Sequence, residues 1–220
     1  MGFSWHVVVS SFPYLLWGAR LTLSASLLAI LLGMVVGVAL ALGRRTGWRP
    51  LTAAIRLYIS FVRGTPLFIQ ILVVFYILPA IGLDIPRFQS GVVALSLNSG
   101  AYISEMIRGG LSAVSGGQIE AARALGMRRS LIWRRVILPQ VFVLILPPLT
   151  MEFTGLLKAS SLLMVIGVVE LTRTAQQIIS TTFRPTEIWL SVAVIYFVLC
   201  FALGMLTRRI EHATLTYRSN

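Results

Sequence analysis

The chain has 220 residues, of which 57% are hydrophobic and only 12% are charged, and its mean hydropathy is +0.86. Soluble domains carry about twice that share of charge, so this composition excludes an ordinary soluble domain and indicates an integral membrane protein. The net charge of +12 comes mainly from arginines that lie between long apolar stretches, which favours a role in membrane topology over nucleic-acid binding.

Five stretches of the chain are predicted to be transmembrane helices. They cover residues 21–42, 64–81, 89–107, 137–157 and 188–206. The first has 22 residues without a charge, about 33 Å of helix, which is enough to cross a hydrocarbon core. It contains Gly33 and Gly37 at the spacing that lets two membrane helices approach closely, although ordinary glycine tolerance explains the pair equally well.

The connecting segments differ in character. Residues 55–63 are expected to lie at the interface before the second span, because Arg56 and Arg63 share one helical face. The prolines in the fourth span are expected to kink it and to free backbone carbonyls. Residues 158–187 are mixed, and their apolar part, 162–169, is too short to span.

The basic residues fall mostly on one side of this five-span arrangement. That side holds Arg44, Arg45, Arg49, Arg108, Arg123, Arg128, Arg129, Arg134, Arg135, Arg208, Arg209 and Arg218, and the other holds Arg20, Arg87, Arg173 and Arg184. The positive-inside rule makes the richer side cytoplasmic. We therefore expect an all-α polytopic membrane protein, with residues 1–220 forming one transmembrane domain, its N-terminus outside and its C-terminus inside.

The cytoplasmic loop at residues 111–135 is polar and basic. Residues 118–125 are good helix formers, and Gly126 suits the position just after a helix end. A short helix of this kind could dock in a cleft of a soluble partner or lie on the membrane surface, and its periodicity leaves both open.

This loop also resembles a known one. Glu120, Ala121 and Ala122, then Gly126, and nine residues later the run at 136–139, are similar to the E-A-A…G…I-x-L-P loop of binding-protein-dependent ABC importer permeases, with Val136 in place of the usual Ile. Further segments resemble the polar amino-acid branch of that family. They are residues 18–24, the R-G-T-P segment within 58–66, A-Y-x-x-E-x-x-R-G at 101–109, Gly117-Gln118, Leu138-Pro139-Gln140, and 157–162.

The resemblance implies a division of labour. Two permease subunits, identical or different, would form the pathway for a polar amino acid in the bacterial inner membrane, surrounded by lipid. A dimer of cytoplasmic ATPases would bind ATP and Mg, and this chain itself would hold no cofactor. An extracytoplasmic binding protein would deliver the substrate. The residues implied in coupling to the ATPase are Gln118, Glu120, Ala121, Ala122, Leu125 and Gly126.

Polar residues inside the predicted spans are candidates for the substrate pathway. Charges in the membrane are costly and often functional, so Glu152 is proposed to meet an ammonium or guanidinium group, with a gating or inter-subunit pair as the alternative. The other candidates are Met151, Thr154, Lys158, Gln70, Thr65 and Asn98. Each of these could equally stabilise helix packing through hydrogen bonds to a neighbouring helix. Glu105 is instead expected to pair structurally with Arg108.

Other classes of protein fit less well. A secondary transporter often shows inverted repeats, and we find no repeat between the two halves of the chain. An enzyme is not expected, because the chain lacks a Ser/His/Asp or His/Glu cluster and a G-x-x-x-x-G-K-[ST] loop. His6, His212 and Cys200 lack ligand-spaced company, so no metal site is expected. Met151 stands where the branch has Asn, and Ala159 and Ser160 replace an acidic residue and Thr, so an opine, ectoine or other small zwitterion stays open as cargo.

Overall fold

The structure is a computed structural model that describes residues 2–219, with side chains for residues 2–207 and 209. Every regular element in this range is a helix, which confirms the all-α prediction. The side chains of Arg208, His212 and Arg218, which entered the charge count and the metal assessment, lie outside the described residues.

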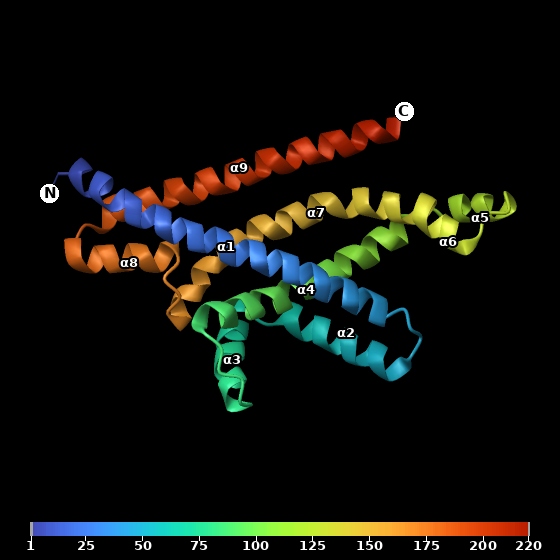
Figure 1. Cartoon of the computed structure of the whole chain (residues 1–220), viewed down its shortest axis with the longest axis horizontal. Coiled ribbons are helices and arrows are strands. Elements are labelled where there is room, and N and C mark those ends of the chain that lie inside the picture. Colours follow the sequence, from blue (N-terminus) through green and yellow to red (C-terminus); the bar gives the residue numbers. More distant parts are fainter. Residues whose placement is uncertain (1, 220) are drawn as a thin grey trace.

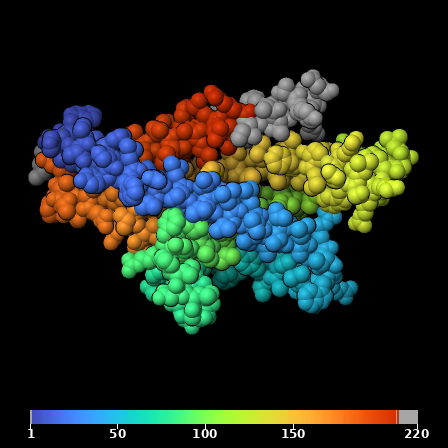
Figure 2. Space-filling model, in the orientation of Figure 1, coloured from blue at the N-terminus to red at the C-terminus, as the bar shows by residue number. Residues whose placement is uncertain are grey.

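The helices form an elongated bundle (Figure 1). In chain order they are α1 (Trp5–Gly43), α2 (Arg49–Gly64), α3 (Leu67–Ala80), α4 (Arg87–Ala113), α5 (Gly116–Ala124), α6 (Arg129–Ile132), the π-helix η1 (Trp133–Ile137), α7 (Leu138–Ala159), the 3-10 helix η2 (Ser160–Ile166), α8 (Leu171–Thr182) and α9 (Pro185–Ser219). Helices α1, α4, α7 and α9 follow the long axis, so the N-terminus and α5 lie at opposite ends. Figure 2 shows α1 crossing one face and α3 projecting from the bundle.

The helices that could cross a membrane differ in detail from the predicted spans. Among the described residues, three helical segments are long and apolar enough, namely Trp5–Gly43, Arg129–Ile166 and Pro185–Thr207, and the bent pair α2 and α3 makes a fourth if it counts as one span. α1 begins well before residue 21, and its 39 residues extend about 58 Å. α2 begins at Arg49, earlier than the predicted interfacial start at residue 55.

α4 corresponds to the predicted third span, but it is not among the helices that are apolar enough to cross a membrane on composition alone. The reason is its position in the bundle, where it packs against α1, α2, α3 and α7. Its buried positions are occupied largely by small and polar residues, including Ser96, Asn98 and Ser99, because close helix packing in membranes favours such side chains. Its 27 residues extend about 40 Å, so a span remains sterically feasible, and the count of five stays a prediction.

The close approach expected at Gly33 and Gly37 occurs within the chain, between α1 and α4. A Cβ at Gly37 would lie 2.6 Å from the Ile103 side chain, and one at Gly33 would lie 3.0 Å from the Cβ of Ser99. Gly100 on α4 is equally close to α1, since a Cβ at this position would lie 2.5 Å from the Val36 side chain. The glycine pair is therefore used to build the fold of one chain, and no surface for a second copy follows from it.

The mixed region at residues 158–187 folds into η2 and α8, and α8 packs against both α1 and α9. Glu170 precedes α8, and its fully buried carboxylate accepts hydrogen bonds from the backbone N–H groups of Thr172 and Arg173, each at 2.8 Å. Thr22 of α1 and Tyr196 of α9 also donate to it, at 3.5 and 3.3 Å. One side chain thus caps α8 and ties α1, α8 and α9 together.

Gly18 gives the first testable prediction about this packing. A Cβ at Gly18 would lie 2.8 Å from both the Cα of Leu171 and the hydroxyl oxygen of Thr174, and the backbone of α8 cannot move aside cheaply. Gly18→Ala should therefore destabilise the protein by about 1–3 kcal/mol, as measured by thermal unfolding in detergent. The control is Gly109→Ala, where a Cβ meets nothing within 4 Å and the better helix propensity of Ala should be neutral or stabilising. Equal melting temperatures for the two variants would refute the close contact.

Candidate functional site

The break between α2 and α3 shapes the first candidate site. The chain bends by 118° between the two helices, across Thr65 and Pro66, both of which have extended backbone. Proline forces its predecessor out of the helical region and offers no N–H, so the R-G-T-P segment breaks the helix. The predicted second span, residues 64–81, therefore begins at the break itself, and the 14 residues of α3 extend only about 21 Å.

A polar side chain takes up the backbone groups that the break leaves free. The amide nitrogen of Gln70 donates to the carbonyl oxygens of Val62 and Thr65, at 2.7 and 3.0 Å. The amide nitrogen of Asn98 on α4 donates in turn to the side-chain oxygen of Gln70 at 2.9 Å. Gln70, predicted as a pathway residue, is only 8% exposed and is thus engaged in holding the break against α4.

A small cavity lies directly beside this break. It has a volume of about 250 Å³ and lies where the break, α4 and α7 meet. Three of the predicted pathway residues line it, one from each of these elements: Thr65, Asn98 and Glu152. The first and last of these, Thr65 and Glu152, are 87 positions apart in the sequence, so only the tertiary fold brings them together.

The remaining pathway candidates lie elsewhere. Met151 is 75% exposed on the outer surface of α7 and does not line the cavity. The hydroxyl of Thr154 donates to the carbonyl of Thr150, which keeps it within its own helix. Lys158 is exposed near the end of α7. The structure therefore divides the predicted set into three residues at the cavity, Gln70 behind it, and three residues away from it.

Sequence reasoning missed one prominent side chain of this cavity. Tyr102 lies four residues after Asn98 on the same face of α4 and lines the cavity with it. The guanidinium of Arg63, at the end of α2, lies 5.7 Å from the centre of the Tyr102 ring, within the range of a cation–π contact. The spacing in the sequence could have identified Tyr102, because a side chain one helical turn from Asn98 lies on the same face of the helix.

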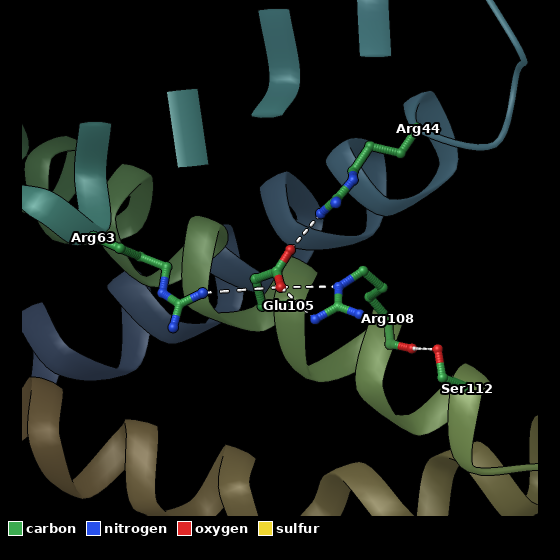
Figure 3. A network of polar contacts seen from close by, with 5 residues as sticks. All are labelled: Arg44, Arg63, Glu105, Arg108 and Ser112. Atoms are coloured by element: carbon green, nitrogen blue, oxygen red, sulfur yellow. Dashed lines mark hydrogen bonds and ion pairs between the residues drawn. The ribbon is translucent and has the colours of Figure 1, made fainter. Parts of the chain in front are cut away.

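An ion-pair network lies one turn further along α4 (Figure 3). Glu105 pairs with Arg108 at 2.8 Å, which confirms the predicted structural pair. Arg44 at the end of α1 also forms an ion pair with Glu105, and Arg63 lies 3.9 Å from it. The network therefore joins α1, α2 and α4 at the basic end of the bundle, with one carboxylate shared among three guanidinium groups.

The second candidate site is α5, which corresponds closely to the helix predicted at residues 118–125. The helix ends in a Schellman motif: Gly126 N–H donates to the Arg123 carbonyl at 2.9 Å, and Met127 N–H donates to the Ala122 carbonyl at 3.1 Å. Gly126 has a φ of +71°, a conformation that glycine adopts without strain. The predicted role of Gly126 as the residue just after the helix end is confirmed.

The faces of α5 divide the predicted coupling residues. Ala122 is buried, and together with Val114, Ile132, Ile137 and Val141 it forms a small apolar core that fixes α5 to α7. Ala122 thus positions the helix. The other members of the set are exposed: Gln118, Glu120, Ala121, Leu125 and Gly126. Leu125 is 82% exposed, so its side chain takes no part in fixing the helix to the rest of the chain.

The way α7 begins explains why α5 projects from the end of the bundle. The helix entering α7 widens into the π-helix η1 just before Pro139, which cannot donate a backbone hydrogen bond. Gln140 donates its side-chain amide to the Val136 carbonyl at 2.8 Å, which adds a side-chain hydrogen bond at the junction of η1 and α7. The turn after α5 leads into a long helical segment, Arg129–Ile166, that follows much of the long axis of the molecule (Figure 1).

These features together define a class of protein. Apolar helices long enough to cross a membrane, a broken helix beside a polar cavity and an exposed helix at the basic end are the parts of a membrane permease, which moves a solute and catalyses no reaction itself. Residues 29–215 match the family described as binding-protein-dependent transport system inner membrane component. The chain belongs to this family. It is a multi-pass inner membrane protein of an ABC importer, and it works with an ATPase and a substrate-binding protein.

Individual relatives are similar over nearly the whole chain. The L-cystine transport system permease protein TcyB of Bacillus subtilis (strain 168) is 39% identical over 94% of this chain and 89% of its own length. The glutamine transport system permease protein GlnP of Escherichia coli (strain K12) is 38% identical over 96% of this chain and 97% of its own. A crystal structure of an amino acid ABC transporter with histidines includes a chain that is 39% identical, with a TM-score of 0.90 over 97% of this chain and 100% of that one.

Proposed function

We propose that this permease carries polar amino acids or small zwitterions derived from them, and that the cavity at the helix break takes part in their passage. The cavity supports this by its size and lining. Its volume of about 250 Å³ lies just below the ~300–1,000 Å³ of sites for drug-sized ligands, which suits a small solute. The transport systems named for its relatives carry glutamine and cystine.

Glu152 is the residue that gives the cavity its chemical character. A carboxylate recognises an ammonium or guanidinium group through charge-assisted hydrogen bonds, which are about twice as strong as neutral ones. The side chains of Thr65 and Asn98 supply neutral hydrogen-bonding groups from the facing elements. A cation-binding carboxylate beside neutral polar groups matches an amino acid whose amino group or side chain is charged.

The assembly follows from the same proposal. Residues 1–220 form one transmembrane domain that pairs with a second permease subunit, either the same chain or a sister. Two ATPase subunits bind ATP and Mg at the basic end, and each receives an α5 helix. Closure of the ATPases moves α5, and the helical rod from α6 to η2 transmits the movement to Glu152, which lies on it. The cavity then opens alternately to the two sides of the membrane.

Uptake into proteoliposomes tests the substrate class. The chain is reconstituted with its ATPase and binding protein, and uptake of labelled arginine, glutamine, cystine and an opine is compared. Glu152→Gln should lower uptake of the cationic substrate by roughly 10- to 100-fold, the loss expected for one charged hydrogen bond in a binding site. ATPase association should persist.

Met151→Ala is the matched control, because Met151 is adjacent in sequence but faces away from the cavity. Unchanged uptake kinetics in Glu152→Gln would remove Glu152 from the pathway and leave the gating or inter-subunit role in its place. Uptake of none of the amino acids by the assembled wild-type system would refute the proposed substrate class.

A further inference from the structure

A second polar pocket lies at the basic end of the bundle, away from the cavity at the break. Its volume is about 330 Å³, and four arginines line it: Arg44, Arg45, Arg56 and Arg108. Within the described part of the chain, Glu105 pairs with Arg44 and Arg108, whereas no carboxylate lies within ion-pair distance of Arg45 or Arg56. The pocket therefore has an excess of positive charge that the fold itself does not neutralise.

One buried hydroxyl at this pocket is also unsatisfied. Ser104 lines it from α4, is fully buried, and its oxygen has no hydrogen-bond partner among the described residues. Buried polar groups are rarely left unpaired, because the loss of hydration costs about 1–3 kcal/mol. An anion in the pocket would meet both needs once the Ser104 side chain rotates toward it, since its oxygens accept hydrogen bonds from a hydroxyl and from guanidinium groups.

An apolar groove lies beside this pocket. The groove has a volume of about 620 Å³ and lies between the last turns of α1, the end of α4 and the start of α7. It shares Ala41, Arg45 and Leu111 with the arginine pocket, so the two cavities adjoin along these residues. Figure 2 shows the later part of α1 beside the start of α7, with the end of α4 behind them.

The polar residues of the groove gather at one end of it. The guanidinium of Arg45 lies 4.5 Å from the centre of the Trp133 ring, and Arg129 lines the groove near them. From Val38 to Arg45 the groove follows α1 for about 10 Å. Tryptophan and arginine are the residues that lie at the level of lipid headgroups, so the apolar remainder of the groove extends into the hydrocarbon region.

We propose that this bipartite site binds one anionic phospholipid of the cytoplasmic leaflet. Its phosphate lies in the pocket of Arg45, Arg56 and Ser104, and an acyl chain follows the groove between α1 and α7. A free phosphate would use the pocket alone and a neutral lipid the groove alone, whereas an anionic lipid matches both parts. Basic pockets between membrane helices on the cytoplasmic side bind acidic headgroups in this manner. The lipid would brace α1 against the start of α7, close to α5.

Tryptophan fluorescence tests the site directly, because Trp133 lines the groove. In the full chain the other four tryptophans are changed to Phe, and the protein is reconstituted in phosphatidylcholine with increasing phosphatidylglycerol that is brominated on its acyl chains. Saturable quenching of Trp133 at a low fraction of brominated phosphatidylglycerol, and weaker quenching by brominated phosphatidylcholine, is the expected result.

Two variants separate this site from general attraction of lipid to a basic surface. Arg45→Gln with Arg56→Gln should weaken binding by about 25-fold, whereas Arg134→Gln with Arg135→Gln, an equal loss of charge on exposed residues outside both cavities, should leave it nearly unchanged. Ala41→Phe, which fills the junction, should also abolish saturable quenching. Native mass spectrometry should show one phosphatidylglycerol bound to the wild type and to the Arg134/Arg135 control variant. The Arg45/Arg56 variant and Ala41→Phe should lose it.

Any of four results would overturn the proposal. Equal quenching by the two lipids, or equal losses in both arginine pairs, would show ordinary lipid solvation of a basic surface. Displacement by inorganic phosphate with no effect of Ala41→Phe would show a free-anion site instead. Protection of Trp133 from both lipids, together with a disulfide-linked dimer from Leu42→Cys, would show that a second copy of the chain covers the groove.

Discussion

Replacing Leu125 with Asp is expected to separate the permease from its ATPase and so to abolish transport. Leu125 is 82% exposed at the end of α5 and contributes nothing to the core of its own chain, so the substitution should not disturb the fold. Loss of a central apolar anchor in an interface costs about 2 kcal/mol or more, which weakens association by about 30-fold or more. A carboxylate buried there without a partner adds to the loss.

Co-purification of the ATPase with the tagged permease in detergent measures this effect, and uptake into proteoliposomes measures its consequence. Ser130→Asp is the matched control, because it places the same charge on an exposed residue of α6, which follows α5 in the chain. Gly126→Val tests the same surface through the backbone, since a β-branched residue at a φ of +71° is strained and should displace the end of α5. Undiminished ATPase recovery with Leu125→Asp would mean that α5 is not the docking helix.

Removal of the Glu170 side chain should produce the largest loss of stability in the chain. Glu170→Ala leaves two backbone N–H groups at the start of α8 and the hydroxyls of Thr22 and Tyr196 without their acceptor, and it opens a cavity among them. Each buried donor left unpaired costs about 1–3 kcal/mol, so a total loss of several kcal/mol is expected. Thermal unfolding in detergent measures this loss, with Glu120→Ala as the control on an exposed carboxylate.

The pH dependence of stability gives an independent check on Glu170. Burial raises the pKa of the Glu170 carboxyl, and the hydrogen bonds from Thr172 and Arg173 oppose this shift only in part. With its folded pKa above the unfolded value, the group contributes stability that is present in full below the unfolded pKa and is lost as pH rises through the folded pKa. Glu170→Gln, which cannot ionise, should remove this component and should melt between the wild type and Glu170→Ala. A melting profile with the same pH dependence in Glu170→Gln would show that another group is responsible.

Local features of the sequence determined much of this protein. The long uncharged runs, the arginines between them and the helix-forming stretch that ends at Gly126 predicted an all-helical membrane protein with an exposed helix in a basic loop. Hydropathy, charge and helix ends depend on residues within a few turns of one another, so they can be predicted without knowledge of the packing. The resemblance of the loop and of the R-G-T-P segment to one family was confirmed by the match over residues 29–215.

Contacts between distant parts of the chain were decided only by the tertiary structure. Gly33 and Gly37 had two open interpretations until α4 was found against them. Gln70 was predicted as a pathway residue, and only the fold shows that its amide also bonds to the backbone at the break between α2 and α3. Glu170 carried no local signal, because its role depends on hydroxyl groups from α1 and α9, which are far from it in sequence. A polar residue in an apolar helix has the same local pattern whether it binds a substrate or a neighbouring helix. Which of the two it does is set by the groups that the fold places opposite it.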